Sequence, residues 1–187
     1  MSLYSRSHEL LAVQNSQLLV IDMQEKFVPH IAEMELVTDN CHKLLEAAQK
    51  LDVPKYATEQ YPKGLGKTIE KLAGYFDEIP EKLRFSSAEV LNWKNAAERE
   101  DNRFQLVIAG IETHICLLQT TFDFLAQGYR VYIPADAVGS RHKLDKEIAL
   151  QRMADAGAII TTTESVLFEW CEIAGTDLFK EISKLVK

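Results

Sequence analysis

Three residues with side chains capable of chemistry stand where apolar runs of the sequence end. Asp22 directly follows the run at residues 18–21, Lys82 follows a short extended stretch, and Cys116 lies six residues after Gly110, which ends the strongest apolar run. A cysteine attacks a substrate as a thiolate, so it needs a base that takes its proton and a cation that balances its charge. Together these residues would supply nucleophile, proton acceptor and charge balance.

Each of the three residues also has an ordinary structural interpretation. Cys116 could be a small buried residue, as most cysteines are. Asp22 could cap a helix or order a loop, and Lys82 could be a solvated surface lysine. Two physical points favour chemistry. A carboxylate at the end of an apolar strand is costly without a partner or a task. A thiol in the first turn of a helix has its pKa lowered by the helix start, where free N–H groups can also receive an oxyanion.

The elements that must position these residues alternate along the chain. Apolar runs predict buried parallel strands at residues 18–21, 105–109, 130–133 and 158–160, with weaker candidates at 53–58 and 79–82. Apolar periodicity predicts helices over residues 34–51, 113–127, 144–153 and 178–185. Strand–helix alternation of this kind is typical of a parallel sheet with helices on both faces. Residues 61–74, rich in Gly and Pro, are interpreted as a loop over one end of the sheet.

Composition narrows the class of protein. The formal charge of the 187 residues is −7, spread along the chain, which disfavours a nucleic-acid surface. No apolar stretch is long enough to span a membrane, and no secretory signal is recognised. The three cysteines, Cys41, Cys116 and Cys171, are odd in number and far apart, which indicates a reducing compartment. We therefore expect a single domain over residues 1–187 with a cytoplasmic location.

Four motifs, in order along the chain, carry a family resemblance: LVIDMQEKF at residues 19–27, KLRFS at 82–86, AGIETHIC at 109–116 and DAVGSR at 136–141. Each is weak alone, but their order and spacing resemble those of the isochorismatase-like cysteine hydrolase superfamily over about residues 15–165. The segment TEQYPKGLG at 58–66 is similar to the subgroup of isochorismatase-domain-containing proteins.

The resemblance implies a fold and a mechanism. The fold would be a three-layer αβα sandwich with a six-stranded parallel sheet in the order 3-2-1-4-5-6, in which the first and fourth strands are neighbours. Asp22 would take the thiol proton, Cys116 would attack a carbonyl or similar carbon, and Lys82 would steady the developing charge. A cis peptide bond between Ile111 and Glu112 would turn the backbone amides of Glu112 and Cys116 toward the oxyanion.

We expect hydrolysis of an amide- or imide-type C–N bond, or a related bond, in a small molecule of unknown identity. The residues expected to bind it are Gln24, Phe27, Gln60, Tyr61, His114 and Ile115. His114 is two positions from Cys116 on the expected helix, so the two side chains should diverge rather than form a dyad.

Other classes of site are disfavoured. Nicotinamidases in the superfamily place metal-binding histidines after the second strand, where this chain has Thr58, Glu59, Gln60 and Tyr61, so no metal or other cofactor is expected. The segment KGLGKT at 63–68 lacks the first glycine of a phosphate-binding loop.

Two other functions stay open: a non-catalytic member that binds a metabolite or a protein, and a redox role for Cys116. The family usually assembles into oligomers, and Phe168, Trp170 and Phe179 could form an apolar face. A homo-oligomer, a dimer or larger, is therefore expected.

Overall fold

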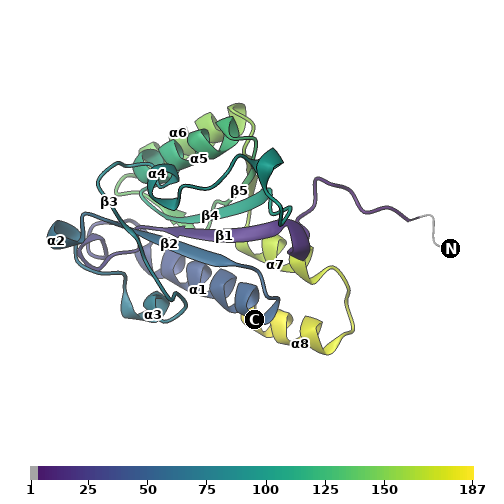
Figure 1. The fold of residues 1–187 in the computed structure, drawn as a ribbon. Helices are drawn as coiled ribbons and strands as arrows, with labels where there is room; N and C mark the ends of the chain where they lie inside the picture. Colours follow the sequence, from purple (N-terminus) through teal and green to yellow (C-terminus); the bar gives the residue numbers. More distant parts are fainter. Residues whose placement is uncertain (1–3) are drawn as a thin grey trace.

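The computed structural model describes residues 4–187, in which parallel strands form a central sheet between two layers of helices (Figure 1). Seven strands are found in this part of the chain: β1 (Ser16–Ile21), β2 (Lys55–Gln60), β3 (Glu81–Lys82), β4 (Gln105–Ile111), β5 (Arg130–Pro134), β6 (Val138–Gly139) and β7 (Ile159–Thr161). Their order is β3-β2-β1-β4-β5-β7, with β6 paired to β4. The predicted sandwich and strand order are confirmed, and the predicted strand number of six is one too few because β6 is only two residues long.

The two central strands, β1 and β4, are buried along their whole length. Each is covered on both faces, which is why its sequence is an almost continuous apolar run. The register pairs Ile21 with Gly110, so the two carboxyl ends lie side by side. Gly110 has a φ of +113°, and a Cβ there would lie 2.2 Å from the carbonyl oxygen of Ile21. Only glycine permits this close approach, which fixes the chain following β4 beside the chain following β1.

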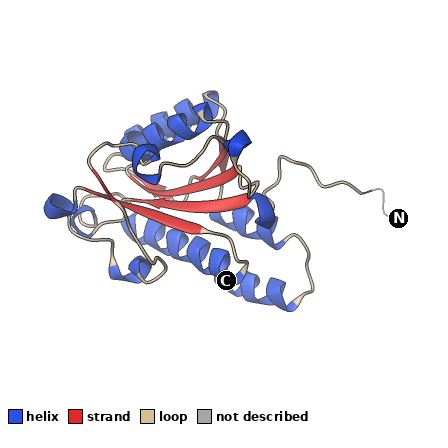
Figure 2. Ribbon diagram, in the orientation of Figure 1, coloured by secondary structure: helices blue, strands red, loops and turns tan. Residues whose placement is uncertain are grey.

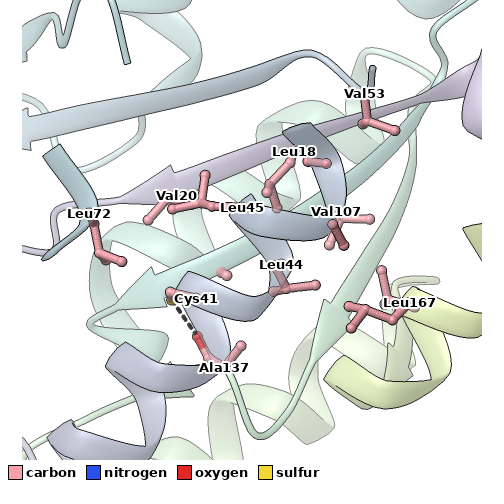
Figure 3. Packing of buried hydrophobic residues seen from close by; sticks show 14 of the residues in the cluster. Leu18, Val20, Cys41, Leu44, Leu45, Val53, Leu72, Val107, Ala137 and Leu167 are labelled. Atoms are coloured by element: carbon pink, nitrogen blue, oxygen red, sulfur yellow. Dashed lines mark hydrogen bonds between the residues drawn. The ribbon is translucent and has the colours of Figure 1, made fainter. Parts of the chain in front are cut away.

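Three helices cover one face of the sheet: α1 (Met34–Lys50), α7 (Thr163–Cys171) and α8 (Asp177–Leu185). The other face is covered by a π-helical turn (Thr113–Leu117) with α5 (Leu118–Ala126), and by α6 (Lys143–Asp155) (Figure 2). Side chains alternate along β1, so Leu18 and Val20 pack toward α1 while Leu19 and Ile21 pack toward α5. Figure 3 shows the core under α1, where Cys41 lies among aliphatic side chains.

Short helical turns connect these elements: α2 (Pro62–Leu65), α3 (Glu70–Ala73), α4 (Ala88–Leu91) and 3₁₀ turns at Val13–Asn15, Glu25–Phe27 and Ala96–Glu98. Residues 61–74, interpreted from the sequence as a loop over one end of the sheet, contain the two short helical turns α2 and α3. Local bonds close these turns, such as Gly64 N–H to the Tyr61 carbonyl at 2.9 Å. One turn is too short to show apolar periodicity in the sequence.

The aromatic residues expected to form an oligomer face are used inside the fold. Trp170 is buried, and the half-buried rings of Phe168 and Phe179 contact each other with their centroids 6.1 Å apart. They stabilise the packing of α8 against α7, so the expected apolar face is wrong. No helix among residues 4–187 has the length and apolar character needed to cross a membrane.

Candidate active site

Asp22 and Lys82 form a buried ion pair at the carboxyl edge of the sheet. The Lys82 Nζ lies 2.7 Å from the Asp22 Oδ2, and both side chains are at most 2 % exposed. Asp22 follows β1 with a φ of +52°, a left-handed conformation that is uncommon for a residue with a side chain and often marks functional sites. Lys82 ends β3, two strands away, and the order β3-β2-β1 brings the two ends to one edge.

The ammonium of Lys82 is held by several acceptors besides Asp22. It donates to the side-chain oxygen of Gln60 at 2.7 Å and to the carbonyl of Phe85 at 2.8 Å. Gln60 is itself fixed by Gln24, which accepts from the Gln60 backbone N–H at 2.8 Å and donates to its carbonyl at 3.0 Å. A buried charge is costly unless it is fully partnered. These bonds hold the ammonium in one position.

The thiol of Cys116 interacts with this pair. Cys116 lies in the π-helical turn between β4 and α5, close enough to Asp22 and Lys82 that both charges act on the pKa of its thiol. π-helical turns are rare and occur frequently at functional sites. The sequence placed Cys116 in the first turn of a helix that begins at Thr113. The structure has that turn, but with π rather than α geometry. Asp22, Lys82 and Cys116 are thus brought together as the sequence predicted.

The pKa of the Cys116 thiol is shifted in the opposite direction to the one expected from the sequence. Burial raises the pKa of the Cys116 thiol well above its ordinary value, and the charge of Asp22 raises it further, against the opposing effect of Lys82. The expectation that the helix start lowers this pKa is therefore wrong, because desolvation outweighs the partial charge of the amides. Burial likewise raises the pKa of Asp22, against Lys82 and its hydrogen bonds. The resting thiol holds its proton beside a carboxylate more basic than an ordinary aspartate.

The backbone leading to Cys116 has an unusual geometry. The peptide bond between Ile111 and Glu112 is cis, at the position that the family resemblance implied. The Glu112 side chain is buried and accepts bonds from Arg141, through the backbone N–H at 3.0 Å and through Nε at 3.1 Å. Glu112 therefore ties the turn before Cys116 to the segment that follows β6.

A buried chain of hydroxyl groups connects Asp22 to the turn that carries Cys116. Thr58 donates to Asp22 Oδ1 at 2.9 Å and lies 3.1 Å from the Ser87 hydroxyl. The Ser87 backbone N–H donates to the Thr120 hydroxyl at 2.9 Å, which in turn donates to the Cys116 carbonyl at 2.7 Å. Thr58, Ser87 and Thr120 were not predicted from the sequence to support the site. The strand register that aligns Thr58 with Ile21 places the Thr58 hydroxyl beside Asp22.

A cavity of about 530 Å³ opens beside the Cys116 sulfur. This volume is in the range of sites for small molecules. It is lined by Lys26, Phe27, His30, Gln60, Leu65, Phe85, Glu112, Ile115, Cys116 and Arg141. Asp22 and Lys82 are buried and are not among the residues that line this cavity.

The residues expected to bind substrate divide into two groups. Phe27, Gln60 and Ile115 line the cavity, and Gln24 lies behind Gln60 and supports it. Tyr61 and His114 are not among the lining residues. Tyr61 is half-exposed and lines a separate cavity, and the His114 Nδ1 lies 3.0 Å from the Ser140 hydroxyl. The divergence of His114 from Cys116 thus agrees with the helical geometry.

Several residues of the cavity wall were not predicted from the sequence: Lys26, His30, Leu65, Phe85 and Arg141. All five follow or lie within short turns and loops, where periodicity gives no signal. Across residues 4–187 no group of three or more His, Cys, Asp or Glu side chains is arranged to hold a metal ion.

The fold and the site define a class of protein: a parallel three-layer α/β structure with a Cys–Asp–Lys group at the carboxyl edge of its central strands. The isochorismatase domain model matches residues 16–165. Isochorismatase domain-containing protein 2 of Danio rerio is 39 % identical over 94 % of this chain and 89 % of its own length. The chain belongs to the isochorismatase family and has that family's hydrolase fold.

Solved structures agree with this assignment. The structure described as the MAR1 ribonuclease of Caenorhabditis elegans is 36 % identical, with a TM-score of 0.86 over 95 % of this chain and 92 % of that chain. The YcaC gene product of Escherichia coli, described as an octameric hydrolase of unknown specificity, has a TM-score of 0.82 at 21 % identity, over 97 % of each chain. The second likeness is one of fold.

Proposed function

We propose that this chain is a hydrolase that cleaves an amide- or imide-type C–N bond, or a related bond, of a small molecule through a covalent intermediate on Cys116. The observation that carries the proposal is the contact of one thiol with a buried carboxylate and a buried ammonium, beside a cavity of about 530 Å³. A thiol used only for packing needs neither a base, nor a cation, nor a cavity.

Asp22 acts as the general base in this mechanism. The thiol proton passes to the Asp22 carboxylate as the sulfur attacks the carbonyl carbon, so no resting thiolate is required. This agrees with the raised pKa of Cys116 and the raised pKa of Asp22, which make the thiol a poor acid and the carboxylate a better base. Lys82 stabilises the negative charge while it moves from carboxylate to sulfur.

The remaining steps return the enzyme to its starting state. The backbone N–H groups of Glu112 and Cys116 bind the tetrahedral oxyanion. As the C–N bond breaks, the leaving nitrogen takes the proton from Asp22 and a thioester remains. Water then attacks the thioester, Asp22 takes its proton, and the acid leaves as the sulfur recovers a proton. Phe27, Gln60 and Ile115 contact the substrate, while Gln24 positions Gln60; neither a metal nor another cofactor takes part.

Trapping of the intermediate tests the proposal. The protein is mixed with a panel of small amides, imides and ureido acids, quenched in acid within seconds, and analysed by mass spectrometry. We expect an added acyl mass on the peptide that contains Cys116, together with turnover, and neither in Cys116→Ala. Turnover that persists in Cys116→Ala, or no acylation and no turnover across the panel, would contradict it and favour a binding function for the cavity.

The ribonuclease description of the Caenorhabditis elegans neighbour suggests RNA as a second substrate for this chain. We infer that RNA is not the substrate, because a formal charge of −7 opposes binding of a phosphate backbone. Incubation with labelled single-stranded RNA should give no cleavage above that of Cys116→Ala. Cleavage that disappears in Cys116→Ala would reverse this inference.

We also propose that the chain forms a homo-oligomer, as YcaC of Escherichia coli is described to do, and that it acts in the cytoplasm. The three unpaired cysteines support a reducing compartment. Sedimentation equilibrium that gives a monomer mass at micromolar concentration would contradict the oligomer.

A further inference from the structure

The wall of the cavity beside Cys116 is not uniform. Phe27, Phe85 and Ile115 make one part of it apolar, whereas Lys26, His30 and Arg141 bring basic groups to the same cavity. The single acidic side chain that lines it among the described residues is Glu112. The cavity therefore has two permanent positive charges, Lys26 and Arg141, against one negative charge, in a chain whose formal charge is −7.

Arg141 is the basic group that is best fixed in position. Its Nε donates to the buried Glu112 carboxylate at 3.1 Å, and its backbone N–H donates to the same oxygen at 3.0 Å. No partner of its two terminal NH₂ groups is found among residues 4–187. A guanidinium held through Nε presents the fork of donors that recognises a carboxylate in a bidentate manner.

Lys26 adds a positive charge that no carboxylate neutralises. Its Nζ donates to the Gly64 carbonyl at 2.8 Å, and it forms no ion pair within the described part of the chain. The neutral acceptor fixes the ammonium and leaves its charge uncompensated. His30 is exposed at the same cavity, and its ring has no hydrogen bond to other residues in 4–187. A ligand can thus use both groups without displacing an internal acidic partner.

We propose that this site takes a small organic anion whose carboxylate is bound by Arg141 in the field of Lys26. The apolar body of the anion lies against Phe27, Phe85 and Ile115, and its scissile carbon is directed at Cys116. This inference names the substrate class of the proposed hydrolase and so rests on that function. A neutral amide of the same shape would leave the fork of Arg141 unpaired and would be the poorer ligand.

The charge preference can be measured without the true substrate. Iodoacetate and iodoacetamide alkylate the same thiol and differ in charge, so the ratio of their rates cancels the fraction of ionised thiol. Peptide mass spectrometry gives this ratio separately for Cys116 and for the partly buried, unpaired Cys171, which serves as the internal control. We expect the ratio of iodoacetate to iodoacetamide to be at least about fivefold higher at Cys116 than at Cys171.

Matched variants assign this preference to residues. Arg141→Gln should reduce the ratio at Cys116 about fivefold and Lys26→Gln about twofold, since one positive charge is removed from the cavity in each case. The controls are Arg152→Gln and Lys143→Gln on exposed positions of α6, which remove the same charges and should leave the ratio unchanged. Equal ratios at Cys116 and Cys171 would overturn the proposal, as would equal effects of site and control variants.

A binding measurement decides the case in which the thiol reacts with neither reagent. Calorimetry with 3-phenylpropionate and 3-phenylpropionamide should show at least about fivefold tighter binding of the anion, lost in Arg141→Gln. Equal binding, or binding of neither, would overturn the proposal. A charge preference without any acyl-enzyme would instead leave the anion site standing and remove the proposed hydrolysis, so the two failures are distinguishable.

Discussion

Cys41 and Cys116 are both buried, but different groups surround the two thiols. Cys41 is fully buried in α1, where its thiol donates to the Ala137 carbonyl at 3.6 Å (Figure 3). Burial raises its pKa, as it raises that of Cys116. Cys116 differs by its contacts with a carboxylate and an ammonium and by an adjoining cavity. Burial alone makes a thiol inert, and a reactive one needs a base and room for a substrate.

The comparison is tested most severely by removing each sulfur in turn. Cys116→Ala should abolish turnover of any substrate found in the panel, a loss of at least about 1000-fold, because no other group can form the thioester. Cys41→Ala should change turnover less than twofold and lower the free energy of unfolding by about 1 kcal/mol through lost packing. Steady-state rates and thermal melts of both variants are the measurements. Comparable losses of turnover would refute the distinction.

Removal of the proposed base, Asp22, should reduce turnover nearly as much as removal of the Cys116 sulfur. Asp22→Asn keeps the size of the side chain but cannot take the thiol proton, so we expect a loss of turnover of about 100- to 10,000-fold. Glu25→Gln, on an exposed carboxylate nearby, is the control and should retain activity. Acylation rates from rapid quench separate the chemical step from binding. If Asp22→Asn acylates at the normal rate, Asp22 is not the base.

Removal of the Thr58 hydroxyl, which donates to Asp22, should have a smaller effect on turnover and a specific effect on its pH dependence. The hydrogen bond from Thr58 lowers the pKa of Asp22, so Thr58→Val should raise that pKa further. A carboxylate with a higher pKa takes up its proton at a higher pH, so the acid limb of the rate profile should move to higher pH. Thr58→Ser keeps the hydroxyl and is the matched control; the acid limb of its rate profile should lie at the same pH as in the wild type. An unshifted limb in Thr58→Val would show that the hydroxyl has only a packing role.

The smallest expected effect concerns stability at alkaline pH. Cys41 keeps its proton in the folded state at a pH where the unfolded thiol loses it, because burial raises its pKa. Unfolded thiols ionise as the pH rises through about 9. The contribution of the protonated Cys41 thiol to the free energy of unfolding is therefore complete below about pH 9 and is lost as the pH rises further. Above pH 9, the free energy of unfolding of the wild type should therefore fall by about 1.4 kcal/mol more per pH unit than that of Cys41→Ala. Urea melts at several pH values measure this difference, and identical slopes would contradict it.

The fold was predictable because its signals are strong in the sequence. The runs that became β1 and β4 are continuously apolar, and the stripe of α1 is regular over four turns. Strand β6 and the turns α2 and α3 were missed because elements of two to four residues carry no periodicity. Their positions depend on contacts with the rest of the chain.

The candidate site was only partly predictable. Asp22, Lys82 and Cys116 could be located because motifs mark them and parallel strands gather their carboxyl ends. The predicted direction of the Cys116 pKa shift was wrong, because the position of a residue on a helix does not give the degree of its burial. Arg141 was missed as a cavity residue because its place depends on the buried side chain of Glu112.

The ion pair of Asp22 and Lys82 has a consequence for the robustness of the folded chain. Two opposite charges that are buried away from water stabilise each other, so removal of one leaves the other buried without a partner. A chain that carries Asp22→Leu and Lys82→Met together should therefore melt at a higher temperature than either single replacement. The same replacements would remove the proposed general base and the cation beside it. Apolar replacement of a buried ion pair is often neutral or stabilising, so the double variant should also melt at a temperature no lower than that of the wild type.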